Sequence, residues 1–97
     1  MPTYIHLTSF TGDGVQNITE SPDRLDNAKE LATSLNGEFE EFFLTMGQYD
    51  IVAITEFPDD ETAAKFSLGV ASEGAVTTET LKAFPEDEYR DVIAGLP

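Results

Sequence analysis

The sequence predicts a single α+β domain, covering residues 1–97, in which two β-α-β halves share one antiparallel sheet. Its 97 residues leave room for one hydrophobic core, and its 40% hydrophobic content is normal for a globular chain. Stretches with strand-like alternation are separated by stretches with a helical period. Two strand-like stretches, Tyr4–Phe10 and Ile51–Phe57, resemble each other, and each precedes a helical stretch.

The first half contains a strand and then a helix. Residues Thr3–Thr11 alternate in polarity and are rich in Thr and aromatic residues, which is typical of a strand. Ser21-Pro22 is typical of a helix start, because Ser accepts from a free N–H group of the first turn and Pro donates no hydrogen bond there. Asn36-Gly37 predicts the end of this helix. Its apolar face consists of Leu25, Ala28, Ala32 and Leu35.

The second half opens with a hairpin. Residues Glu38–Met46 and Tyr49–Phe57 are two predicted strands, and Gly47-Gln48 is the expected two-residue turn between them. A helix then starts at Asp59, where an acidic residue is favoured by the helix dipole, and runs up to Gly74. Its expected buried residues are Ala63, Phe66 and Val70.

A strand and a short helix complete the chain. Residues Ala75–Phe84 are rich in Thr and form the fourth predicted strand. A last helix begins at Pro85, with Tyr89, Val92 and Leu96 on one side. The resulting order is βαββαβ, the ferredoxin-like arrangement. Right-handed crossovers give a four-stranded antiparallel sheet in the order 4-1-3-2, with the helices on one face.

The alternation also predicts which residues face the helices. We expect Ile5, Leu7, Val52 and Ile54 to pack under them. The helix-free face would then carry Tyr4, His6, Thr8, Phe10, Ile51, Ala53 and Phe57. Pairing across the turn sets Leu44 opposite Ile51 and Phe42 opposite Ala53, which adds two apolar residues to that face. The sequence therefore predicts a homodimer or higher oligomer, with Phe10, Phe42, Leu44 and Ile51 buried between two sheets.

The charge is strongly negative. Nineteen acidic residues stand against five basic ones, giving a net charge of −14. Such a surface repels phosphate backbones and anionic lipids, so we expect no nucleic-acid and no membrane partner. High salt would screen the repulsion, which indicates a halophilic cytoplasm. The N-terminus has no basic segment followed by an apolar one, and this too favours a cytoplasmic protein.

Several short motifs together resemble the GYD-domain family. They run in order over nearly the whole chain and include Thr8-x-Phe10-Thr11, Ser21-Pro22-x-Arg24, Gly47-x-Tyr49-Asp50-Ile51-Val52, Glu56-x-Pro58-Asp59-Asp60-Glu61 and Gly74-x-Val76-x-Thr78-x-Thr80. The resemblance implies a small ferredoxin-like domain of the dimeric α+β-barrel type. The stretch from Gly47 to Phe84 is also similar to the ligand-binding domain of leucine-responsive-type regulators. That similarity implies a stand-alone sensor of a small ligand such as an amino acid.

Five residues are candidates for a site. His6 is the only histidine, and it could act as a general acid–base group or be a hydrogen-bonded structural residue. Tyr49 and Asp50 could line an interface pocket, or serve the hairpin turn and a subunit contact. Tyr4 could line the same ligand cleft, and Thr78 could line it too or be an ordinary strand residue.

The sequence predicts no metal and no cofactor. The chain has no Cys, and its acidic groups Asp59–Glu61 and Glu86–Glu88 lack the alternating spacing of a calcium loop. No nucleophile elbow or phosphate-binding loop is present. We therefore expect a small-ligand-binding or assembly module with a pocket at the sheet–sheet interface. The alternative is a cofactor-free monooxygenase- or isomerase-like enzyme that uses His6 in a barrel cleft.

Overall fold

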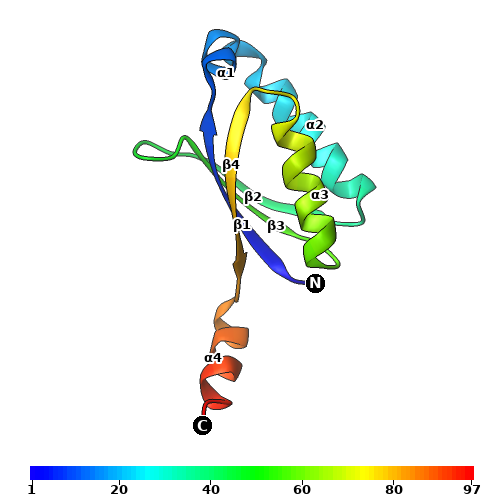
Figure 1. Cartoon of the computed structure of the whole chain (residues 1–97), viewed down its shortest axis with the longest axis vertical. Coiled ribbons are helices and arrows are strands. Elements are labelled where there is room, and N and C mark those ends of the chain that lie inside the picture. Colours follow the sequence, from blue (N-terminus) through cyan, green and yellow to red (C-terminus); the bar gives the residue numbers. More distant parts are fainter.

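The chain follows the predicted βαββαβ order, with short additional elements before its first long helix and after its last strand. A computed structural model describes residues Met1–Pro97 (Figure 1). Its strands are β1 (Thr3–Phe10), β2 (Glu38–Leu44), β3 (Ile51–Glu56) and β4 (Val76–Ala83). Its helices are α1 (Gly12–Gln16), the 3₁₀ turn η1 (Ile18–Glu20), α2 (Ser21–Ser34), α3 (Asp60–Ala71) and α4 (Glu86–Ala94).

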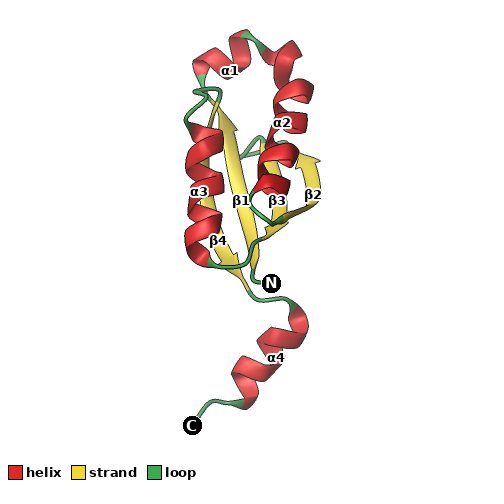
Figure 2. Ribbon diagram, turned by 90° about the vertical axis from the view of Figure 1, so that its right-hand side faces the viewer, coloured by secondary structure: helices red, strands yellow, loops and turns green.

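The four strands form one antiparallel sheet in the order β2-β3-β1-β4, which is the predicted order read from the other edge. Helices α2 and α3 cover the same face of this sheet (Figure 2). The Asp59 carboxylate caps α3 by accepting from the Thr62 N–H at 2.8 Å. Ser21 does not cap α2, because that helix continues directly from η1. The predicted fold class is confirmed.

The hairpin between β2 and β3 is wider than predicted. Leu44 and Ile51 are paired as expected, but the strands end there, and Thr45–Asp50 forms the connection. Asp50 is held against β1, because its N–H donates to the Thr8 carbonyl at 2.9 Å and its carboxylate accepts from the Phe10 N–H at 2.9 Å. Across the hairpin, the Thr45 N–H donates to the Asp50 carbonyl at 2.8 Å, but strand pairing does not extend to Met46 and Tyr49, so the predicted two-residue turn was wrong.

The helices cover the opposite sheet face from the one predicted. In β1 the buried residues are Tyr4, His6 and Thr8, while Ile5 and Leu7 on the other face are partly exposed. In β3 the buried residues are likewise Ile51, Ala53 and Thr55, followed by Phe57. The reason lies in the helices. At the packed end they present Ala32 and Ala63 beside Phe66, and the rings of Tyr4 and Phe57 fill the space that these small residues leave.

The packed core occupies only one end of this layer. It consists of Tyr4 and Phe57 from the sheet side, Ala32 from α2, and Ala63 and Phe66 from α3. The Phe57 and Phe66 rings lie 5.0 Å apart between centroids. The helical core residues come from the C-terminal end of α2 and the first two turns of α3, which both lie near the start of β1. At their other ends, the apolar residues that face the sheet remain partly exposed.

Helix α4 stands apart from the rest of the domain. It extends beyond the end of β4, away from α2 and α3 (Figures 1 and 2). None of its residues is buried, and this arm accounts for the elongated 51 × 31 × 17 Å shape of the chain. Its apolar side chains are Tyr89, Val92, Ile93 and, just beyond the helix, Leu96, all of them exposed.

Candidate functional site

His6 lies beneath the helices in a set of polar contacts. Its Nε2 lies 2.7 Å from the Thr55 hydroxyl and its Nδ1 lies 3.0 Å from the Thr80 hydroxyl. Its ring packs on Phe66 of α3, with 5.3 Å between centroids. Burial lowers the pKa of His6 from 6.5 to about 4, because the imidazolium would lose its hydration there. His6 is therefore neutral at physiological pH and has only hydroxyl partners, with no carboxylate to support acid–base work.

The Thr80 contact connects the sheet to α3. The Ser67 hydroxyl of α3 lies 2.7 Å from the Thr80 hydroxyl, which in turn contacts His6. Nearby, the Thr8 hydroxyl donates to the Thr78 hydroxyl at 3.2 Å. No buried side-chain polar atom is left without a partner. The polar groups under the helices are thus uncharged and satisfied.

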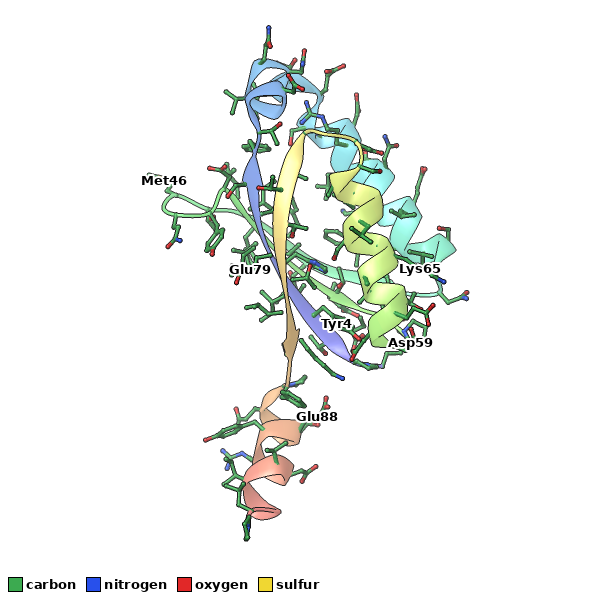
Figure 3. The ribbon with its side chains drawn as sticks, in the orientation of Figure 1. Tyr4, Met46, Asp59, Lys65, Glu79 and Glu88 are labelled. Atoms are coloured by element: carbon green, nitrogen blue, oxygen red, sulfur yellow. The ribbon has the colours of Figure 1, made fainter.

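Tyr4 and Asp50 have structural contacts. The Tyr4 hydroxyl donates to Asp60 Oδ1 at 2.6 Å, and the same carboxylate forms an ion pair with Lys82 at 3.1 Å. Burial, together with Asp60, raises the pKa of Tyr4 to about 12. This bond attaches the first turn of α3 to β1. Figure 3 labels Tyr4 on β1 and Asp59 at the start of α3. The Asp50 carboxylate accepts a hydrogen bond from the Phe10 N–H of β1.

Tyr49 lies on the other side of the sheet from His6. Its hydroxyl donates to Glu79 Oε2 at 2.8 Å, and this bond raises the pKa of Tyr49. Glu79 is paired with Leu7, so it belongs to the helix-free face, and Figure 3 shows it on the side away from α2 and α3. The predicted site residues are therefore not together: His6 and Thr78 share one face, and Tyr49 lies on the other.

A cavity occupies the unfilled end of the layer between α2, α3 and the sheet. Its volume is about 310 Å³. Apolar side chains form most of its wall, and His6, Thr8, Ser67 and Thr78 are the polar groups nearest the sheet and α3. Two charged residues line it as well, Arg24 of α2 and Glu73 at the end of α3. Sequence reasoning missed this cavity, because Leu25 and Ala28 follow the same helical period that a filled core would produce.

The helix-free face of the sheet is the second candidate. We call it the open face. It carries Ile5, Leu7, Val52 and Ile54 on the two central strands, all partly exposed. Phe43 of β2 and Leu81 of β4 flank them with 51% and 40% of their surface exposed. Phe10, Phe42 and Ile51, predicted for this face, line the cavity on the helix side instead.

Comparison with known proteins shows the family. The model of the GYD domain matches residues 4–93. The chain belongs to the GYD domain family. A relative in Thermus thermophilus, named glutamine synthetase and cystathionine beta-lyase binding protein, is 35% identical to it over 97 residues, which cover 99% of each chain. No solved structure matches the chain significantly.

One acidic cluster of this GYD domain could offer oxygen ligands to a hard cation. Glu38, Glu40 and Glu56 place carboxylate oxygens within 4.8 Å of one another at the bulge in β2. Hydrogen bonds shared with Glu56 and Glu38 raise the pKa of Glu40 to about 7. The cluster is largely exposed and has no basic partner, so its carboxylates mainly repel one another.

No helix of the domain combines the length and the apolar character needed to cross a bilayer.

Proposed function

We propose that this GYD domain is an oligomeric protein-binding module that self-associates through its open face and binds a client enzyme. The observation that carries the proposal is the uncovered apolar surface at the centre of the sheet. Ile5 is paired with both Ile54 and Leu81, and Leu7 is paired with Val52, so the apolar side chains are contiguous across three strands. A contiguous apolar surface of this kind usually marks an interaction site.

A second copy of the chain is the occupant that fits the open face. The centre of the open face is made of the two central strands, so a two-fold axis would set this apolar surface against the same surface of the second copy. α4 projects past the end of β4, at an edge of the same sheet, and has an apolar side that its own domain leaves uncovered. It can therefore reach a neighbouring copy. A pocket between two sheets, as predicted from the sequence, would form only in such an oligomer.

The client part of the proposal rests on the relative. The Thermus thermophilus protein is named for binding glutamine synthetase and cystathionine beta-lyase, and its similarity extends over both full chains. We extend protein binding to this chain on that basis. The acidic outer surface favours a client with a basic patch, because opposite potentials steer association.

Light scattering in multimolar KCl tests the assembly. The wild-type chain should be a dimer or larger, and Leu7→Lys should be a monomer, because a lysine ammonium cannot be buried unpaired between two sheets. Ala64→Lys adds the same charge on the exposed side of α3 and should keep the oligomer. A monomeric wild-type chain at micromolar concentration would overturn the assembly proposal.

Biolayer interferometry with two purified enzymes tests whether the chain binds a client. Glutamine synthetase and cystathionine beta-lyase from the same organism are each titrated against the immobilised wild-type chain at low and high KCl. Saturable binding of either enzyme is the expected result. If neither enzyme binds at any salt concentration, the client proposal is wrong, whatever the oligomeric state.

A further inference from the structure

The cavity beneath α2 and α3 is built differently from the open face on the other side of the sheet. Its volume of about 310 Å³ falls at the lower end of the about 300–1,000 Å³ typical of small-molecule sites. Protein interiors seldom leave a space of this size, since close packing contributes to stability. The cavity is partly open to the surface, and a mostly apolar lining with a few polar groups is typical of such sites.

The interior of the cavity suits a hydrocarbon group. Phe42, Leu25 and Val70 contribute apolar wall from three different elements. On the sheet side, the Thr8 hydroxyl is committed to Thr78, and His6 is held neutral between two hydroxyls. No charged group therefore lies on the sheet side of the cavity, and the part of a ligand that enters should be uncharged.

Arg24 supplies the one positive charge among the lining residues. It is half-buried, and its guanidinium donates only to the carbonyl oxygen of Asn17. Three of the other four basic residues are ion-paired, Lys65 with Glu61, Lys82 with Asp60 and Arg90 with Glu86. Lys29, the fourth, lies over the Phe39 ring and has no carboxylate partner either, so Arg24 is set apart because it lines the cavity. A planar guanidinium is suited to bind a carboxylate with two hydrogen bonds.

We propose that this cavity binds a small monocarboxylate with an apolar or aromatic body, whose carboxylate pairs with Arg24 and whose body lies against the sheet. Glu73, exposed at the end of α3, also lines the cavity and disfavours a second negative charge. This site is independent of the open face, because the two lie on opposite sides of the sheet.

Phenylacetate is a suitable probe, and its binding can be measured by two-dimensional amide NMR of the full chain. Saturable shifts should appear at residues such as Thr8, Val70 and Thr78 and not on the open face. Acetate, which lacks the body, and phenylacetamide, which lacks the charge, should each bind at least about tenfold more weakly. Phthalate, with two charges, should also bind more weakly. Shifts confined to the open face, or no saturable shifts, would overturn the proposal.

Arg24→Gln tests the charge separately from the cavity. It should abolish the roughly tenfold preference for phenylacetate over phenylacetamide while leaving phenylacetamide binding unchanged. Lys65→Gln is the control, since it removes one positive charge from α3 at an exposed residue that does not line the cavity. Ala28→Leu, which fills the cavity, should weaken both probes. An unchanged preference in Arg24→Gln, or unchanged binding in Ala28→Leu, would contradict the proposed site.

Discussion

His6 Nε2 lies 2.7 Å from the hydroxyl of Thr55, a residue with no exposed surface, so the only histidine of the chain is anchored in the protein interior. The ring has a hydroxyl near each of its nitrogens, and the Phe66 ring packs beside it at a tilt of 58°. Protonation would place a charge on a ring that is almost fully buried and has no carboxylate partner. This relationship makes His6 a source of acid sensitivity.

The stability of the fold should fall as the pH drops from 6.5 towards 4. The pKa of His6 is about 4 in the folded state and 6.5 in an unfolded chain, so the unfolded state binds the proton first. The stabilisation is complete above pH 6.5, and about 3 kcal/mol of it is lost by pH 4. Urea unfolding of the wild-type chain and His6→Gln at both pH values measures the difference. Parallel losses in the two proteins would show that His6 is not responsible.

Asp50 should contribute to stability through its contact with β1. Asp50→Ala removes the acceptor of the Phe10 N–H and should cost roughly 1–2 kcal/mol of unfolding free energy. Asp50→Asn keeps an oxygen that can accept and should retain most of the stability. Denaturant unfolding of the wild-type chain and the two variants measures these differences in unfolding free energy. If Asn is as destabilising as Ala, the negative charge matters and not the hydrogen bond.

Glu40→Gln should stabilise the fold above neutral pH. The pKa of Glu40 is raised from 4.5 to about 7, so the folded state favours the protonated form. The stabilisation from that proton is complete below pH 4.5 and lost as the pH rises through 7. The melting temperature of Glu40→Gln should therefore exceed that of the wild-type chain at pH 8 in low salt. Glu30→Gln, an exposed acid on α2, is the control for loss of one charge.

Stability should rise steeply with KCl concentration. The net charge is −14, and only three ion pairs offset the repulsion. Salt at multimolar concentration shortens the screening length to about 3 Å or less, so distant carboxylates no longer repel one another. Thermal melts from millimolar to multimolar KCl measure this dependence. A melting temperature that does not change across the series would refute the halophilic prediction.

The order of the elements could be predicted because it depends on local chemistry. The repeat between Tyr4–Phe10 and Ile51–Phe57 predicts two strands, and the acidic residue Asp59 predicts a helix start. The structure contains both strands and the helix start. The register at Leu44 and Ile51 was also correct, although the turn was not. The contacts of Asp50 with β1 come from a segment 40 residues away, and no local pattern reveals them.

The face assignment could not be obtained from alternation alone. Both faces of β1 carry apolar residues, with Ile5 and Leu7 on one side and Tyr4 on the other. The choice depends on tertiary packing: next to Ala32 and Ala63 the helices leave space that Tyr4 and Phe57 fill, and this volume is not visible in the alternation. The same misassignment placed His6 on an open cleft and left the real cavity unpredicted. Arg24 was part of a family motif, but nothing in the sequence indicated that it lacks an acidic partner.

Helix α4 has a further consequence for any association it takes part in. Its nine residues are fewer than the ~12–15 that an isolated helix needs to be stable in water. None of its residues is buried against its own domain, so its helicity depends on the surface on which it docks. Part of the docking free energy is then used to order the arm. The bound state is weakened by that amount, and subunits or clients that α4 holds can exchange readily while the sheet beneath stays folded.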